Sequence, residues 1–268
     1  MQGTASVQEL IIGVVKTIYI TGDCHAEWNR FSTENFPEQK EMTRDDYVIV
    51  CGDFGIWDGS KRERWWLDWF AEKSFTLLFC DGNHENFDQL EGHEVVDFHG
   101  GKAHKIRENV YHLMRGHVFD LCGKKFFVFG GARSHDIQDG ILDIKDYGSA
   151  EEMVCDYKFR TYHLRQMLRI NHVSWWEQEM PSREEMEFGM ATLGTHDNKV
   201  DFIVSHCCPQ EIASLMSGGF YKPDELTLYF NEVARTTEFS KWFFGHYHDN
   251  QQFLGKYVLL YEQIVRIL

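Results

Sequence analysis

Five short apolar runs recur along the chain, and polar residues follow each of them. The runs cover residues 17–20, 47–50, 76–80, 201–204 and 241–244 and are rich in β-branched and aromatic side chains. Runs of this length and composition predict strands. The polar residues that follow are Thr21-Gly22-Asp23-Cys24-His25, Gly52-Asp53, Gly82-Asn83-His84-Glu85, Ser205-His206 and Gly245-His246-Tyr247-His248. Because loops at the carboxyl ends of strands meet in layered α/β folds, we expect these five segments to converge on one site.

A helix is expected over residues 61–73, between the second and third of these strands. Its aromatic residues, spaced i, i+1, i+4 and i+5, form one apolar stripe that we expect to pack in the core: Trp65, Trp66, Trp69 and Phe70. A surface of stacking aromatics for nucleic-acid bases is the less favoured interpretation of the same stripe.

The middle and end of the chain show further strand and helix patterns. Runs at 110–114, 117–122 and 125–129 predict strands with short connections, and Gly123-Lys124 suits a hairpin turn. Ser182 and Glu185 have the spacing of a capping box and open a helix over 186–193. Another helix is expected to begin near Asp224.

The length and the absence of linkers favour a single domain. A chain of 268 residues exceeds the usual domain size only slightly, and no repeat, low-complexity tract or Pro/Gly/Ser linker divides it. The segment of about 132–200 is charged and shows little periodicity. We therefore expect residues 1–268 to form one domain, with an insertion at about 132–200 that caps the site.

Charge and cysteine content narrow the class of protein. The formal net charge is -15, and no long block of Lys or Arg occurs, which disfavours an extended nucleic-acid ligand. The seven Cys are odd in number and lack a Cys-x-x-Cys pair, so we expect buried thiols in a reducing compartment. The apolar stretch 10–20 is interrupted by Lys16, and no run reaches membrane-spanning length. We expect a cytoplasmic protein with no membrane partner.

The polar residues at the strand ends are suited to holding metal ions. They combine two carboxylates, one amide and four imidazoles, namely Asp23, Asp53, Asn83, His25, His206, His246 and His248. Such nitrogen and oxygen donors suit two divalent ions, with Mn, Fe, Zn, Co and Ni all compatible. Asp53 is the natural candidate for a carboxylate that bridges two ions.

This series of motifs resembles the calcineurin-like metallophosphoesterase superfamily, in its bacterial- or phage-type metallophosphatases. The resemblance spans Asp23 to His248. It implies an α/β fold in four layers, a two-sheet β-sandwich flanked by helices. It also implies that one metal is held by Asp23, His25, Asp53 and His248.

By the same resemblance, the second metal is held by Asp53, Asn83, His206 and His246. A hydroxide between the two metals would attack phosphorus in line, and His84 would be the catalytic imidazole that protonates the leaving oxygen or stabilises its charge.

The chain departs from the family pattern in places that bear on the substrate. Ile56 stands where a second Asp would follow Asp53, and the Arg of the Ser/Thr protein phosphatase branch is missing there. Arg133, with His135 beside it, is a candidate substitute for binding phosphate, although a surface or ion-paired Arg133 is an equal alternative. Trp175 and Trp176 either shape the pocket or simply pack within the insertion.

These features predict a dinuclear-metal-dependent phosphoesterase that hydrolyses phosphomonoesters or phosphodiesters. A Ser/Thr protein phosphatase is the alternative enzyme, and a non-catalytic metal-binding scaffold is the alternative from another class. The presence of His84 and of all seven ligand residues argues against the scaffold. The natural substrate, the metal and the oligomeric state stay open.

Overall fold

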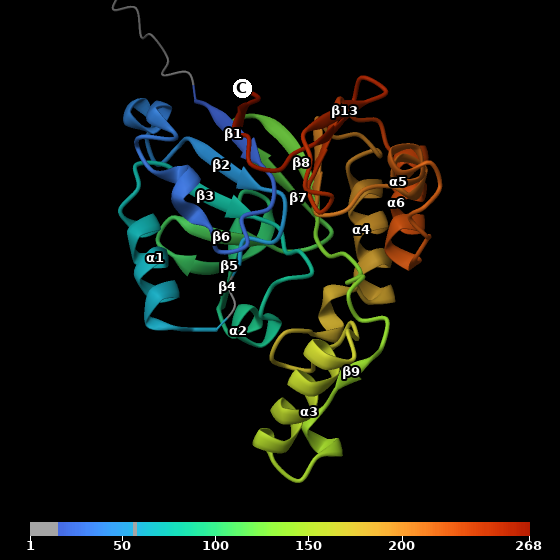
Figure 1. The fold of residues 1–268 in the computed structure, drawn as a ribbon. Coiled ribbons are helices and arrows are strands. Elements are labelled where there is room, and N and C mark those ends of the chain that lie inside the picture. The colour runs from blue at the N-terminus through green and yellow to red at the C-terminus, as the bar shows by residue number, and fades with distance from the viewer. Residues whose placement is uncertain (1–15, 56–57) are drawn as a thin grey trace, which may run out of the picture.

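Two β-sheets pack face to face, with helices on their outer faces (Figure 1). The computed structural model describes residues 16–55 and 58–268. Ile56 and most of the apolar stretch 10–20 lie outside these residues. The two-sheet sandwich flanked by helices that the sequence predicted is confirmed.

The first sheet contains the three amino-terminal strands of the predicted site. Its strands are β1 Ile18–Thr21, β2 Tyr47–Val50, β3 Thr76–Phe79, β4 Glu94–Phe98, β5 Gly101–Arg107, β6 Val110–Leu113 and β15 Val265–Arg266. Across the described residues, the order of these seven strands is β15-β1-β2-β3-β6-β5-β4. Strands β1, β2, β3 and β6 are parallel, so the carboxyl ends of β1, β2 and β3 lie at one edge.

The second sheet supplies the two carboxy-terminal strands of the site. Its strands are β7 His117–Leu121, β8 Lys124–Phe129, β11 Phe202–Ser205, β12 Lys241–Phe244, β13 Gln251–Phe253 and β14 Tyr257–Leu259. In the part of the chain that is described, they follow the order β13-β14-β12-β11-β8-β7. Strands β8, β11, β12 and β14 are parallel, which brings the ends of β11 and β12 together.

Three apolar layers separate the sheets and helices. Alternate residues of a strand face opposite sides, so Ile49 of β2 packs between the sheets while Val48 and Val50 pack toward the outer helices. Burial on both faces explains why these strands are continuous apolar runs in the sequence. The middle layer contains Phe119, Phe126 and other residues of both sheets.

The helices divide between the two outer faces. The first sheet is covered by η1 Trp28–Phe31, η2 Pro37–Glu41, α1 Lys61–Ala71 and α2 Phe87–Glu91. The second is covered by α4 Arg183–Thr195, α5 Gln210–Ser217 and α6 Glu225–Thr236. The capping box at Ser182 begins α4, and α6 begins after Asp224, both as predicted. The structure shows in addition that Asp224 forms a capping box with Thr227. Among the described helices, none has the length and apolar character needed to cross a membrane.

The prediction for the aromatic stripe of α1 was wrong at Trp65. Phe70 is fully buried, and Trp66 and Trp69 pack partly against the core, but Trp65 is 58% exposed. Five residues at 3.6 per turn place Trp65 roughly 140° around the helix from Phe70. The face that packs on the sheet is instead centred on Leu67 and Phe70.

The hairpin between β7 and β8 turns one residue earlier than predicted. Leu121 pairs with Lys124, so the two turn residues are Cys122 and Gly123. Both have positive φ, +55° and +73°, which suits a two-residue turn that follows the twist of the strands.

The predicted insertion 132–200 divides into two parts. Its last helix, α4, packs on the second sheet through Leu193. Residues 136–181, which we call the insertion lobe, project from the sandwich and contain β9 Ile141–Leu142, η3 Ile144–Asp146, α3 Ala150–His163, β10 Arg169–Ile170 and η4 Glu177–Glu179 (Figure 1). The lobe contacts α2, where Trp176 Nε1 donates to Asp88 Oδ2 at 2.7 Å.

Candidate metal centre

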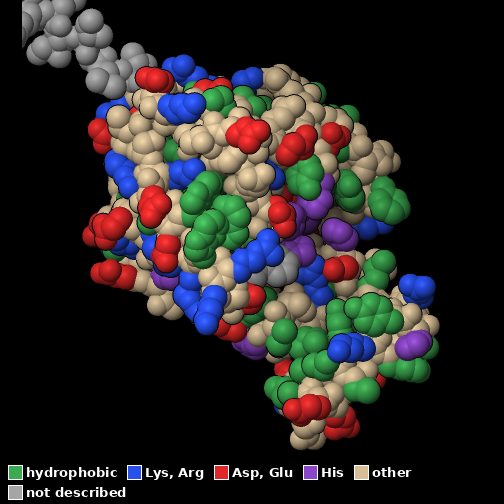
Figure 2. All heavy atoms as spheres, turned by 60° about the vertical axis from the view of Figure 1, so that its left-hand side comes forward, with side chains coloured by type: hydrophobic (Ala, Val, Ile, Leu, Met, Phe, Trp, Pro, Cys, Tyr) green, Lys and Arg blue, Asp and Glu red, His purple; other side chains and the backbone are tan. Residues whose placement is uncertain are grey.

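The five predicted segments converge at the ends of five parallel strands. The loops after β1, β2 and β3 bring Asp23, Asp53 and Asn83 from the first sheet. The loops after β11 and β12 bring His206, His246 and His248 from the second. Space-filling Figure 2 shows several histidines gathered in a recess above the insertion lobe.

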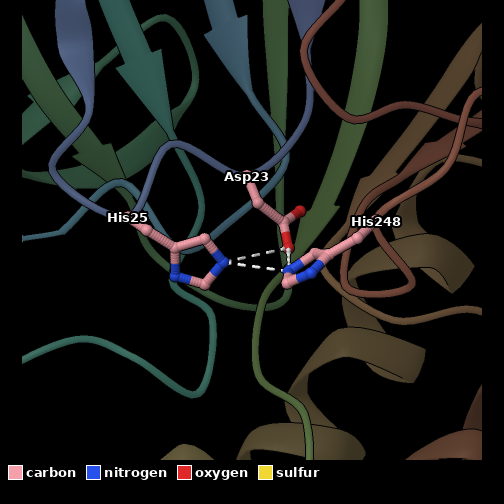
Figure 3. A group of neighbouring side chains, drawn as sticks. All are labelled: Asp23, His25 and His248. Atoms are coloured by element: carbon pink, nitrogen blue, oxygen red, sulfur yellow. Dashed lines mark hydrogen bonds and ion pairs between the residues drawn. The ribbon is translucent and has the colours of Figure 1, made fainter.

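Asp23, His25 and His248 form the first cluster of donors (Figure 3). The Nε2 atoms of His25 and His248 lie 2.9 Å apart. Asp23 Oδ2 lies 3.0 Å from His248 Nε2 and 3.7 Å from His25 Nε2. Both imidazoles therefore point their Nε2 atoms at one carboxylate oxygen.

Asp53 and His206 form the second cluster, with Asp23 beside them. His206 Nε2 lies 3.3 Å from Asp53 Oδ2 and 3.2 Å from Asn83 Oδ1. The His206 Nδ1–H donates to the Cys51 carbonyl at 2.8 Å, so Nε2 is the ring nitrogen that faces the carboxylate and the amide. The ring of His246 lies 5.0 Å from that of His206, centroid to centroid.

The loops hold these side chains in a backbone conformation that few residues adopt. Four of the seven predicted ligands have positive φ: His25 at 48°, Asp53 at 48°, His246 at 68° and His248 at 51°. Non-glycine residues in this region carry a steric cost and gather at functional sites. Backbone bonds fix the conformation, as in the donation from His25 N to Asp53 O at 2.7 Å.

Two glycines are required because the loops approach each other so closely. A Cβ on Gly82 would lie 2.0 Å from Asp53 Oδ1, and a Cβ on Gly245 would lie 2.0 Å from Asp23 Oδ1. In each case the glycine makes room for a carboxylate of another loop. The backbone N–H groups of His84 and His246 donate to these same two oxygens, each at 2.8 Å.

Burial and charge set the pKa values in the centre. Burial alone would raise the pKa of the Asp23 and Asp53 carboxyls, but His206 and its neighbours hold both well below their usual range. Burial alone would lower the pKa of His206, but Asp53 and Asp23 raise it to about 10. Burial, with His206 nearby, lowers the pKa of His246 to about 3. Two buried carboxylate charges thus draw positive charge toward them.

The donor set fits divalent cations. Asp23 Oδ2 is buried and makes no well-formed hydrogen bond, although His248 Nε2 is near. Two imidazole Nε2 atoms at 2.9 Å cannot face each other without a proton or a cation to hold them. Mixed imidazole, carboxylate and amide donors are those that borderline divalent ions prefer.

The family model of calcineurin-like phosphoesterases matches residues 16–250. The chain belongs to this family. As a calcineurin-like phosphoesterase it is a metal-dependent phosphoric ester hydrolase in general terms, which agrees with the donor clusters. No curated protein matches the chain closely.

The other predicted site residues of this phosphoesterase lie at different distances from the clusters. His84 shares a possible ligand group with His25 and Asp53, and its ring lies 5.0 Å from that of His25. Burial lowers the pKa of His84 to about 4, with Asp53 opposing and Arg169 adding to the effect. The ring of His135 lies 6.0 Å from that of His246. Arg133 is half exposed and donates to Glu225 Oε2 at 2.8 Å.

The insertion lobe brings residues to the centre that sequence reasoning missed. Arg169 Nη2 lies 3.2 Å from His84 Nε2. Glu179 accepts from the Ser134 hydroxyl at 2.6 Å, and Ser134 Oγ accepts from Asn83 Nδ2 at 3.2 Å. No local sequence pattern could have predicted these contacts, because the partners are far apart in the chain. Arg169 and His84 are separated by 85 residues, and Ser134 and Asn83 by 51.

Two further residues, Glu85 and Arg30, support the loops from behind. Glu85 is fully buried and accepts from the backbone N–H of Phe54 at 2.7 Å and of Gly55 at 3.1 Å, which ties the loop after β2 to the loop after β3. Arg30 Nη2 donates to the Asp23 carbonyl at 2.6 Å. Both therefore hold loop backbone that carries the donors.

Proposed function

We propose that the protein is a dinuclear-metal-dependent phosphoesterase acting on phosphomonoesters or phosphodiesters of small to moderate size. The position of Asp53 carries the proposal. Its Oδ2 atom lies 3.7 Å from His25 Nε2 and 3.3 Å from His206 Nε2, so one carboxylate oxygen faces donors of both clusters. A bridging carboxylate between paired ions has this arrangement.

The residues divide between two metal positions. Asp23, His25, Asp53 and His248 would hold one ion, and Asp53, Asn83, His206 and His246 would hold the other. When bound, divalent ions lower the pKa of water and neutralise charge on phosphoryl oxygens. The nitrogen and oxygen donors are compatible with Mn, Fe, Zn, Co or Ni.

His84 would act on the leaving oxygen. Its backbone N–H is fixed by Asp53 Oδ1 at 2.8 Å, and its ring lies beside that of His25, so the imidazole stays at the edge of the donor clusters. From there His84 protonates the leaving oxygen or stabilises the charge that develops on it.

The insertion lobe would cap the centre and restrict the substrate. Two of its residues reach the loop after β3, Arg169 directly and Glu179 through Ser134. The net charge of -15 supports a compact phosphate ester over an extended nucleic acid. All seven cysteines lie in the described residues and are free, which supports a cytoplasmic location.

A panel of substrates tests this proposal. Metal-reconstituted protein is assayed on aryl phosphates, linear and cyclic diesters and phosphopeptides, beside Asp53→Asn and His84→Ala. We expect hydrolysis of small mono- or diesters, loss of metal and activity in Asp53→Asn, and full metal content with about 100- to 10,000-fold slower turnover in His84→Ala.

Each other result has a defined meaning. Phosphopeptide turnover well above all small esters would favour a protein phosphatase. A metal-loaded protein that hydrolyses nothing across the panel would favour a scaffold. Unchanged turnover in metal-replete His84→Ala would remove that residue from the mechanism.

A further inference from the structure

A buried guanidinium from the insertion lobe lies directly against His84. Arg169, on β10, is 8% exposed. Its Nη2 atom lies 3.2 Å from His84 Nε2 and 3.4 Å from His84 Nδ1. No local sequence pattern indicated this contact, and the calcineurin-like motifs do not include Arg169.

The guanidinium is held rigidly from its other sides. Its Nε lies 2.8 Å from Asp136 Oδ1, and Nη2 donates to Asp136 Oδ2 at 2.9 Å. Its Nη1 donates to the Ser174 carbonyl at 3.0 Å. The guanidinium, whose N–H groups form a planar fork, is therefore preorganised. One Nη2 hydrogen goes to Asp136, and the other is directed at the ring of His84. The Asp136 side chain is 46% exposed, so this side of the pair is open to solvent.

Other arginines near the centre are committed to structural partners. Arg30 donates to backbone carbonyls, including that of Asp23. Arg115 is buried in an ion pair with Asp81 and also donates to the Gln178 carbonyl at 2.7 Å. Arg133 pairs with exposed Glu225. Among these four arginines, Arg169 is the one whose guanidinium nitrogen lies within hydrogen-bonding distance of the His84 ring.

We infer that Arg169 binds the phosphoryl group of the substrate beside His84, as the anion-binding residue that the insertion lobe supplies. A phosphoryl oxygen there would accept the Nη2 hydrogen now directed at the imidazole, and Asp136 would keep the fork in place. A planar, always charged guanidinium is the side chain best matched to a phosphate. This inference rests on the proposed function, because it assumes that phosphate reaches the donor clusters next to His84.

Two independent measurements, phosphate affinity and steady-state kinetics, test whether Arg169 binds the phosphoryl group. Metal-reconstituted wild type, Arg169→Ala, Arg169→Lys, Asp136→Asn and Arg133→Ala are compared in calorimetric titrations with inorganic phosphate and in kcat and KM on the best ester. Arg183→Ala is the matched control, since Arg183 lies in an exposed pair with Glu187 on α4. Metal content and melting temperature are recorded for every variant.

We expect Arg169→Ala to keep its metals, to bind phosphate at least about 10-fold more weakly and to lose about 100-fold in kcat/KM. Arg169→Lys should recover only part of the loss, because an ammonium cannot replace the fork. Added guanidinium should partly restore Arg169→Ala. Asp136→Asn should show a smaller loss, and Arg183→Ala should match wild type.

Two results would overturn the inference. The first is unchanged phosphate affinity in folded, metal-replete Arg169→Ala, and a loss of affinity in Arg133→Ala beside it would assign phosphate binding to Arg133 instead. The second applies when the alanine variant is not folded, in which case unchanged phosphate affinity in Arg169→Lys is decisive. A wild type that binds phosphate but hydrolyses no ester would refute the proposed function, while the phosphate titrations would still decide whether Arg169 binds phosphate.

Discussion

At the scale of the residue, a hydrogen-bond relay sets which end of the Asn83 amide faces the donors. Ser134 has one hydroxyl hydrogen, and it goes to the Glu179 carboxylate at 2.6 Å. Ser134 Oγ must then accept from Asn83 Nδ2, so Asn83 Oδ1 is left toward His206 Nε2. A buried carboxylate in the lobe thereby presents an oxygen, and not an amide hydrogen, to a cation. Burial raises the pKa of Glu179, and the hydrogen bonds from Ser134 oppose that effect.

We predict that Ser134→Ala and Glu179→Gln weaken binding of the metal ion that we propose Asn83 helps to hold, by about 10- to 100-fold. In Glu179→Gln, the new side-chain amide would donate to Ser134, reverse the relay and turn the amide hydrogens of Asn83 toward the centre. Metal titration by calorimetry measures the effect, with Ser240→Ala at an exposed serine as control. Metal affinity in Glu179→Gln equal to that of the wild type would show that the relay does not orient Asn83.

At the scale of the element, the parallel strands were predictable and the insertion lobe was not. Strands β2 and β12 match the predicted runs 47–50 and 241–244, because burial on both faces makes such strands almost continuously apolar, with Lys241 at the start of β12 as the exception. Helix α3 buries only Met153, so it has no strong apolar stripe to detect. Arg169 and Glu179 come from short pieces, β10 and η4, that are placed by tertiary contacts. Sequence motifs thus identified the proposed donors. The residues that support the donors, such as Arg169 and Glu179, could be found only from the three-dimensional structure.

The starts of β1 and β2 are joined by one buried carboxylate, Asp46. Its Oδ1 accepts from Thr17 N at 2.6 Å and its Oδ2 from Thr43 N at 2.7 Å, and both threonine hydroxyls also donate to it. Burial would raise the pKa of Asp46, but the hydrogen bonds from Thr43 and Thr17 lower it.

We predict that Asp46→Ala lowers the free energy of unfolding by about 2 to 4 kcal/mol at pH 7. Because the folded pKa lies below the unfolded value of about 3.9, the contribution is complete above that value and fades as the pH falls through the folded pKa. Urea unfolding from pH 7 to pH 3 measures it. Asp45→Ala, at an exposed pair with Lys16, is the control and should stay near wild type. A difference between Asp46→Ala and wild type that grows on acidification would contradict this account.

At the scale of the whole molecule, the candidate metal centre lies at the seam of the two sheets. Asp23, Asp53 and Asn83 come from loops of the first sheet, and His206, His246 and His248 from loops of the second. Ions held there would link the two sheets, in addition to the apolar layer that the sheets share. Without cations, the buried carboxylates Asp23 and Asp53, which both come from loops of the first sheet, would instead repel each other at this seam.

We predict that a chelator lowers the melting temperature of the metal-loaded protein by at least about 5 to 10 °C, the shift expected for a single ion at about 100 times its dissociation constant. The shift should be much smaller in Asp53→Asn, which loses the shared carboxylate. Differential scanning calorimetry with and without chelator measures both. Equal shifts in the two proteins would mean that the ions stabilise some other region.

The glycines of the donor loops carry a consequence for protein design. Gly82 is small because the Asp53 carboxylate occupies the space where its Cβ would be, and Gly245 is small because Asp23 does. The glycine of each of these two loops is therefore required by the carboxylate of another loop. The residues of one loop alone do not explain its conformation. A designer who grafts one loop into another scaffold would transfer a ligand without the surface that shaped it. These loops are therefore transplantable as a set, with both sheet edges, and not one at a time.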